Sequence, residues 1–273
     1  MTGPQRPAPA ALADQVAEIA RAAGAVILAV RARGPAVRTK ADRTPVTDAD
    51  EAANALISAR LAALTPDVPI VAEESAGGAP VPGARFWLVD PLDGTREFIA
   101  GRDEFTVNIA LIEDGQPVLG VVALPAQDEL YVGVAGAGAW RRRGDGAPAP
   151  IRARAVPAQG ALALASRSHG SARTDRWLAR AGVGRIERAG SALKFCLIAA
   201  GEADLYPRFG RTMEWDTAAG HAVLAAAGGS VRTVSGPDLA YGKPGFANPD
   251  FIARGADALR PRSARPGTGR RRR

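Results

Sequence analysis

Two aspartates lie three positions apart in a short turn that follows an apolar stretch. The apolar run 86–89 leads into the sequence Asp-Pro-Leu-Asp-Gly at residues 90–94. Proline fixes its own φ and glycine adopts dihedral angles that other residues avoid, so the turn is rigid. It can aim the carboxylates of Asp90 and Asp93, with the Leu92 carbonyl between them, at one point. Two carboxylates about 5 Å apart repel by about 3 kcal/mol at an effective dielectric of about 20. A partly buried turn therefore needs a cation or a proton, and oxygen ligands suit Mg²⁺ first and Mn²⁺ second.

The same turn has a purely structural alternative, an Asx-type turn in which Asp93 caps a helix that starts near Thr95. Acids elsewhere in the chain favour the metal site. Glu73 ends a predicted strand over 68–72, and Asp216 lies at the head of a predicted helix. Ligands of open α/β sheets collect at such strand ends and helix starts. Asp50 is less specific, since the helix dipole favours an acid in a first turn whatever its function.

Composition restricts which side chains could bind a metal. The chain has 273 residues, 47% of them hydrophobic, which is enough for one large domain or two close lobes. One cysteine, Cys196, excludes an internal disulfide, and with two histidines it cannot build a zinc cage. Carboxylates remain as ligands. We expect Cys196 to be a packed thiol rather than a nucleophile, and His221 to be structural.

The net charge of +7 belongs to the end of the chain. Seven arginines follow Leu259, and without them 28 basic residues face 28 acidic ones. Such a tail, rich in Pro, Gly and Ser, is typical of a disordered appendage, so we expect no specific nucleic-acid partner. We see no signal peptide, and the longest apolar run, 25–30, is too short to span a bilayer. We therefore expect a cytoplasmic enzyme, with peripheral association with the inner membrane left open.

Periodicity and turn signals predict the elements that position these acids. Helices are expected over 11–32, 51–64, 172–181 and 191–200, the last with Ser191 as N-cap, and from Glu214 onward. Strands are expected over 68–72, 86–89, 105–112, 117–124, 130–134, 161–165, 204–209, 230–234 and 245–253, with a hairpin turn at Asp114 and Gly115. Residues 141–150 are expected as a surface loop between lobes. This predicts tails at 1–10 and 260–273 around a single domain, 11–259, with lobes of about 11–150 and 151–259.

Three motifs together are highly specific: Glu-Glu-Ser at 73–75, Trp-Leu-Val-Asp-Pro-Leu-Asp-Gly-Thr at 87–95, and Trp-Asp-Thr-Ala-Ala-Gly at 215–220. The chain thereby resembles the inositol monophosphatase superfamily of metal-dependent, lithium-sensitive phosphatases over residues 12 to 253. Segments 95–99, 104–112, 193–199 and 206–210 are similar to its CysQ-type 3′(2′),5′-bisphosphate nucleotidases. Arg96, often Lys in that branch, and Asp103, often Gly, depart from the pattern outside the metal positions. The resemblance implies an α/β fold, a layered αβαβα sandwich of the metal-dependent sugar-phosphatase type with two lobes.

The resemblance also implies roles for individual residues. Two or three Mg²⁺ ions, or Mn²⁺, would be held by Glu73, Asp90, the Leu92 carbonyl, Asp93 and Asp216. Catalysis would fall to Asp50 and Thr95, which orient and deprotonate the attacking water, together with Glu73. The substrate would be contacted by Gly94, Thr95, His169, Ser191, Lys194, Arg208 and Asp216. For Lys194 the structural alternative is a lysine that snorkels from a half-buried helix.

The function implied is hydrolysis of the 3′-phosphate of adenosine 3′,5′-bisphosphate to AMP and phosphate, with 3′-phosphoadenylyl sulfate as a further substrate. The partner is then a small-molecule nucleotide, and the protein a monomer or homodimer. An inositol-1-phosphate or other sugar-phosphate phosphatase is the enzymatic alternative. A carboxylate-rich divalent-cation-binding module is the non-enzymatic alternative, although such a module would not need Thr95 and Asp50.

Overall fold

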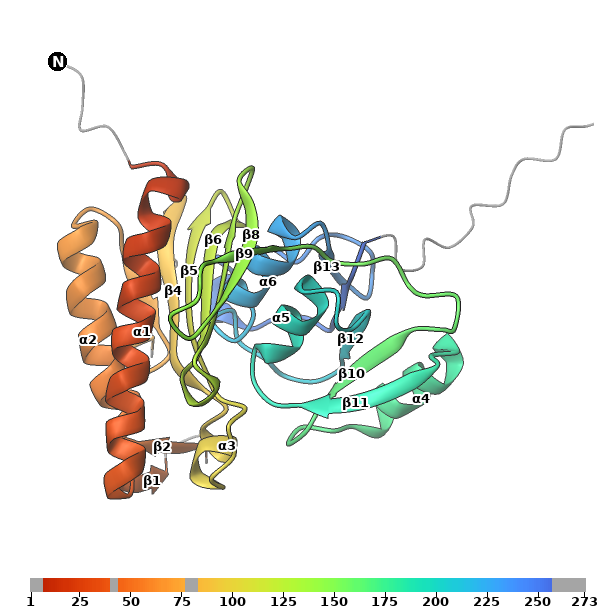
Figure 1. The fold of residues 1–273 in the computed structure, drawn as a ribbon, viewed down its shortest axis with the longest axis horizontal. Helices are drawn as coiled ribbons and strands as arrows, with labels where there is room; N and C mark the ends of the chain where they lie inside the picture. Colours follow the sequence, from red (N-terminus) through yellow and green to blue (C-terminus); the bar gives the residue numbers. More distant parts are fainter. Residues whose placement is uncertain (1–6, 40–43, 77–82, 257–273) are drawn as a thin grey trace, which may run out of the picture.

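The structure, a computed structural model, describes residues 7–39, 44–76 and 83–256. Helices and sheets alternate in five layers, α, β, α, β and α (Figure 1). The predicted α/β sandwich is therefore confirmed. The predicted arginine-rich tail, 260–273, lies outside the described residues, and the lobe boundary near residue 150 stays a prediction. In the described part of the chain, no helix combines the length and apolar character needed to cross a membrane.

The first sheet has seven strands in the order β3-β4-β5-β6-β7-β8-β9. They are β3 (Ile70–Ala72), β4 (Arg85–Asp93), β5 (Thr106–Glu113), β6 (Gln116–Leu124), β7 (Glu129–Val134), β8 (Gly138–Arg143) and β9 (Ala149–Ile151). Only β3 and β4 pair in parallel. Asp114 and Gly115 join β5 to β6 with φ values of 48° and 76°, as in the predicted hairpin.

Helices α1 (Pro9–Arg33) and α2 (Asp48–Leu64) cover one face of this sheet (Figure 1). Trp87 and Val89 pack on that side, whereas Phe86 and Leu88 belong to the core on the opposite face, as the alternation of a strand requires. A small sheet, β1 (Val37–Thr39) and β2 (Pro45–Thr47), connects the two helices. The cap Thr47 makes α2 begin three residues before the predicted start.

Helices α5 (Leu193–Ala199) and α6 (Ala218–Ala226) lie between the two sheets (Figure 1). Two glycines of neighbouring strands allow α6 to lie directly on the first sheet. A Cβ at Gly120 would stand 2.3 Å from the Ala219 carbonyl oxygen, and one at Gly133 2.4 Å from Val223 Cα. Backbone therefore touches backbone here, and any side chain at either position would push α6 away.

The second sheet has the order β11-β10-β12-β14-β13. It contains β10 (Leu162–Ser166), β11 (Arg185–Ala189), β12 (Leu205–Arg208), β13 (Ser230–Thr233) and β14 (Phe251–Arg254), and α4 (Ala172–Ala181) covers its outer face (Figure 1). Short elements complete the fold: α3 (Thr95–Ile99) and the 3₁₀ turns Pro125–Gln127 and Pro244–Phe246.

Several predicted boundaries are wrong. Residues 141–150 are not a continuous loop, because β8 extends to Arg143 and β9 folds back on it. Strand β11 was not predicted, since it is a largely exposed edge strand without an apolar face. The helix with Asp216 at its head begins only at Ala218, because the Glu214 carboxylate instead accepts from the N–H groups of Gly242 and Lys243.

Candidate active site

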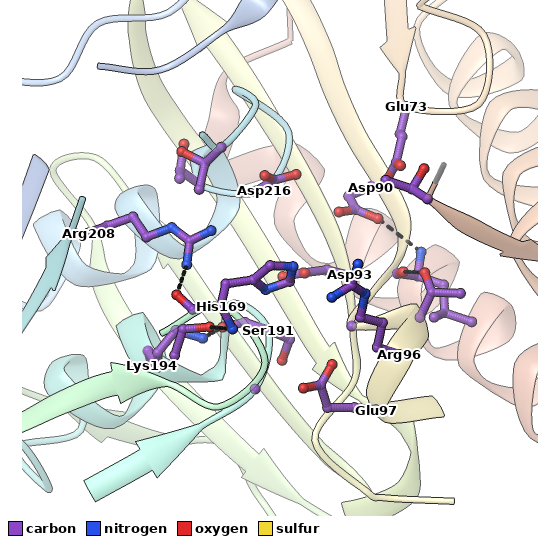
Figure 2. A pocket seen from close by; sticks show the side chains of 18 of the residues that line it. Glu73, Asp90, Asp93, Arg96, Glu97, His169, Ser191, Lys194, Arg208 and Asp216 are labelled. Carbon is purple, nitrogen blue, oxygen red and sulfur yellow. Dashed lines mark hydrogen bonds between the residues drawn. The ribbon is translucent and has the colours of Figure 1, made fainter. Parts of the chain in front are cut away.

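A cavity opens where β4, α3, β10, α5, β12 and α6 come together (Figure 2). All the predicted metal-binding and substrate-binding residues line it: Glu73, Asp90, Leu92, Asp93, Gly94, Thr95, His169, Ser191, Lys194, Arg208 and Asp216. Glu73 and Asp90 lie on one side of the view in Figure 2, and Lys194, Ser191 and Arg208 on the other. Asp50 is not part of the lining, and it contacts the lining residue Thr95.

An irregularity at the end of β4 presents the paired aspartates. Asp90 pairs with Asn108 and Asp93 with Thr106, so that the register shifts between them. The Asp90 carboxylate accepts from the Leu92 N–H at 3.1 Å, and the Asp93 carboxylate accepts from the Asn108 amide at 3.3 Å. The helix that follows, α3, has Gly94 at its N-cap with φ 93° and no side-chain cap. The alternative in which Asp93 caps this helix is therefore wrong, and its carboxylate is available to the cavity.

The acids of the site destabilise one another's charged forms. Asp90 is buried, and its pKa is raised well above the usual range by burial and then by the charges of Glu73, Asp93 and Asp216. Burial, followed by the charge of Asp93, raises the pKa of Asp216 to about 8. Burial likewise raises the pKa of Asp93 to about 6, against the opposing effect of Lys194. A positive charge among these groups would offset both the burial of the carboxylates and the repulsion between them.

The donor set fits a hard divalent cation. Every candidate ligand offers oxygen, from the carboxylates of Glu73, Asp90, Asp93 and Asp216 and from the Leu92 carbonyl. Among the residues that the structure describes, no three acidic, histidine or cysteine side chains already enclose a metal position. A bound cation would offset the repulsion among these like charges.

We expect the metal-free protein to lose stability as the pH rises from about 5 to about 8. In this window the folded state binds more protons than the unfolded one, because the pKa values of Asp93 and Asp216 are raised to about 6 and about 8 from 3.8. Stability then falls with rising pH. Thermal unfolding in a chelator should show this decline, and excess Mg²⁺ should flatten it. A melting temperature that rises over this range without metal would contradict the electrostatic account.

Asp50 and Thr95 are joined beside the aspartate turn. Thr95 Oγ1 lies 3.3 Å from Asp50 Oδ1 and 3.2 Å from the Leu92 carbonyl oxygen. The other carboxylate oxygen of Asp50 accepts from the N–H of Thr47 at 2.8 Å and from its hydroxyl at 2.7 Å. Asp50 is thus both the N3 acid of the α2 capping box and the partner of a cavity hydroxyl. Burial raises its pKa even so.

Lys194 does not snorkel to solvent. Only 4% of the residue is exposed, and its ammonium donates to the Ala189 carbonyl at 3.2 Å and to the Ser191 carbonyl. It also lies 5.1 Å from the centre of the Tyr206 ring. Burial lowers the pKa of Lys194 to about 8, although Asp93 partly opposes this shift. The lysine therefore ties down the loop before α5 while it faces the acidic side of the cavity.

The prediction that Ser191 is the N-cap of α5 is wrong. The N-cap is Ala192, and Ser191 precedes it in the left-handed region with a φ of 42°. This conformation is strained for a residue other than glycine, and such strain is concentrated at functional sites. Its hydroxyl accepts from the Leu193 N–H at 3.4 Å.

Arg208 and His169 form the outer part of the site. The Arg208 guanidinium donates to the carbonyls of His169 at 3.3 Å and of Arg211 at 3.2 Å. Partial desolvation, followed by the charges of Arg208 and Arg96, lowers the pKa of His169. The imidazole is therefore held among cations, next to the space where an anion would be attracted.

Several lining residues were missed by the sequence prediction: Thr44, Pro45, Arg96, Glu97, Ser166, Gly190, Phe195, Tyr206, Thr212 and Thr217. Arg96 and Glu97 directly follow the aspartate turn, so their position could have indicated them. Two groups predicted to be structural do lie in the core. His221 pairs with the Tyr241 hydroxyl at 3.0 Å with a pKa lowered by burial to about 4, and burial raises the pKa of Cys196.

The chain is similar to known proteins of one family. Residues 10–263 match the inositol monophosphatase family. The 3′(2′),5′-bisphosphate nucleotidase CysQ of Escherichia coli K12 is 47% identical over 243 residues, which cover 87% of this chain and 97% of that protein. Among solved structures, CysQ from Bacteroides thetaiotaomicron matches with a TM-score of 0.77 and 37% identity, covering 88% of this chain and 96% of that one. The Thermotoga maritima IMPase matches with a TM-score of 0.74 and 29% identity, covering 88% and 91%.

Proposed function

The chain belongs to the inositol monophosphatase family, and from this we propose that it is a 3′(2′),5′-bisphosphate nucleotidase. It hydrolyses the 3′-phosphate of adenosine 3′,5′-bisphosphate, giving AMP and phosphate, and acts in the same way on 3′-phosphoadenylyl sulfate. The observation that carries this proposal is the cavity itself, in which Lys194 and Arg208 lie across from Glu73 and Asp90. A substrate with one phosphate to cleave and a second to bind fits that division of charge.

Phosphatases of this family depend on a divalent metal, typically Mg²⁺. Two or three ions would be held by Glu73, Asp90, Asp93, Asp216 and the Leu92 carbonyl. When bound, they would supply Lewis-acid stabilisation of the charge on the phosphoryl oxygens.

The protein's own groups position the reactants. The Asp50 carboxylate accepts from Thr95 Oγ1, so it can hold that hydroxyl in the orientation needed to accept a proton from water and pass it on. The backbone N–H groups of Gly94 and Thr95 would bind the phosphate being cleaved. Removal of its proton makes water a competent nucleophile for displacement of the 3′-oxygen, and that oxygen leaves with a proton as the ribose hydroxyl.

The second half of the cavity binds the part of the substrate that does not react. Lys194, Ser191 and Arg208 would contact the 5′-phosphate, and His169 would lie beside the adenosine. Arginine and lysine suit this role because they form charge-assisted hydrogen bonds with phosphate oxygens. A phosphate would also compensate the buried ammonium of Lys194, whose pKa burial lowers.

A substrate panel with released phosphate as the readout tests the proposal. Adenosine 3′,5′-bisphosphate should give a higher kcat/KM than inositol-1-phosphate, AMP or a sugar phosphate. A preference for inositol-1-phosphate would instead establish the alternative phosphatase. Absence of turnover on every substrate with Mg²⁺ would favour the cation-binding module.

Lys194→Ala, together with the longer Lys194→Met, should separate the two phosphate positions. Loss of a charged partner from a desolvated phosphate contact costs about 2–5 kcal/mol. We therefore expect kcat/KM on adenosine 3′,5′-bisphosphate to fall by about 30-fold or more, and that on inositol-1-phosphate by only a few-fold. The methionine variant keeps a side chain of similar length beside Tyr206 and removes the charge. Equal losses on both substrates would mean that Lys194 acts only by tying down the loop at 189–191.

A further inference from the structure

Glu104 lies outside the cavity, on the segment between α3 and β5, yet it contacts residues that follow β10 and β11, in the predicted second lobe. Its carboxylate accepts from Arg167 through two parallel bonds, Nε to Oε2 at 2.7 Å and Nη2 to Oε1 at 2.7 Å. A third bond comes from the Gly190 N–H at 2.9 Å. The same Arg167 also donates to the Arg188 carbonyl at 2.7 Å. One carboxylate of the first lobe thus holds two segments of the second, the end of β10 and the end of β11.

The backbone at Gly190 is packed against the first lobe. A Cβ there would stand 2.6 Å from the Glu104 carbonyl oxygen and 3.0 Å from Glu97 Cγ. Glu97 in turn accepts a hydrogen bond from the Ser168 hydroxyl. The two lobes therefore touch along a short seam, formed by Glu97 and Glu104 on one side and Arg167, Ser168 and Gly190 on the other. We call this set the seam.

The seam supports the substrate half of the cavity. Gly190 lies between Ala189 and Ser191, the two residues whose carbonyls accept from the Lys194 ammonium. Ser191 itself is in a left-handed conformation that its surroundings must maintain. A shift of Gly190 would therefore move Ser191, Lys194 or both relative to Asp93 on the first lobe.

Exposed ion pairs usually contribute little, but this one differs in geometry. Glu104 combines a bidentate guanidinium with a backbone N–H, and the Glu104 and Arg167 side chains are only 23% and 35% exposed. Burial alone would raise the pKa of Glu104, yet the bonds from Arg167 and Gly190 hold it below its usual value. The carboxylate is thus bound as an anion.

We propose that Glu104, acting with Arg167, is a positioning residue that aligns the substrate half of the site with the metal half across the seam. The inference rests on the proposed function, since it requires a substrate that contacts both halves. It predicts that a substrate confined to the metal half will not depend on Glu104.

Glu104→Ala and the near-isosteric Glu104→Gln test this with two substrates, adenosine 3′,5′-bisphosphate and p-nitrophenyl phosphate, which has no second phosphate. We expect kcat/KM on the bisphosphate to fall about tenfold in the alanine variant and less in the glutamine variant, with p-nitrophenyl phosphate changed by less than about twofold. The matched control is Glu202→Ala. Glu202 pairs with Arg141 of the first sheet at 2.6 Å, and neither residue lines the cavity. The Glu202→Ala variant should leave the ratio of the kcat/KM values for the two substrates unchanged.

Amide hydrogen exchange provides a readout that does not depend on activity. Segment 188–192 should exchange faster in Glu104→Ala than in the wild type or in Glu202→Ala, because the Gly190 N–H loses its acceptor. Unchanged exchange, or equal losses on both substrates, would overturn the positioning role. If the wild type does not hydrolyse the bisphosphate, the proposed function fails, and the exchange result alone decides whether Glu104 orders the seam. If the alanine variant does not fold, the kinetics and the hydrogen exchange are both measured on Glu104→Gln.

Discussion

Asp216→Asn, like Asp90→Asn, is expected to lower kcat by at least about 10³-fold while leaving the fold intact. Asparagine retains the shape of aspartate and removes the charge that would hold a divalent ion. Loss of about 4 kcal/mol of metal stabilisation in the transition state corresponds to this factor. The Asp216→Asn variant also removes a carboxyl whose pKa is raised by burial to about 8, so the metal-free protein should become more stable at neutral pH.

Phosphate release at saturating Mg²⁺ measures the first effect, and a Mg²⁺ titration by calorimetry measures binding independently of turnover. Asp238→Asn is a suitable control, because this exposed aspartate pairs with Arg232 on β13 and does not line the cavity. Undiminished turnover in either active-site variant, or wild-type turnover after exhaustive chelation, would refute the metal site.

Thr95→Ala should lower kcat by about 10²-fold or more with little change in KM, since positioned acid–base groups contribute about 10²–10⁴-fold. The hydroxyl of Thr95 contacts both Asp50 and the Leu92 carbonyl, and a methyl group can replace neither contact. Thr95→Ser keeps the hydroxyl and should restore most of the activity. Steady-state kinetics on the three proteins measure the effect.

Asp50→Asn should lower kcat similarly, but it also disturbs the capping box of α2, so its stability must be measured in parallel. Thr95 does not belong to that box, and comparison of the two variants separates chemistry from helix capping. A Thr95→Ala enzyme within a few-fold of the wild type would show that the pair does not act on the water.

The sequence predicted that Asp90, Leu92 and Asp93 would face one point, and all three line the same cavity, because they are close together in the chain. Asp90, Leu92 and Asp93 belong to one rigid turn, and a turn of five residues has few conformations. The predicted helix over 172–181 and the hairpin at Asp114 and Gly115 were also found, since each depends on local signals.

Features that depend on distant partners were missed. Glu214 looks like a helix start, but its acceptor oxygens are used by Gly242 and Lys243, which lie far along the chain. Strand β11 owes its place to pairing with β10 rather than to its own exposed side chains. Glu104 lies just before the apolar strand β5, and nothing in this local pattern predicts its contact with Arg167, 63 residues later. Local sequence rules cannot predict such contacts, because the contacts form only when residues far apart in the sequence come together in the folded chain.

The contact of α6 with Gly120 and Gly133 affects which substitutions this protein can accept during evolution. Two side chains in contact can adjust by changing rotamer, whereas two backbones have a single distance of closest approach. The segment that carries Asp216 is thereby held at a fixed separation from the sheet that carries Asp90. Mutations that accumulate among the alanines, valines and leucines around this contact can alter packing without altering that separation. Core residues can thus be substituted during evolution while the distance between Asp216 and Asp90 stays the same.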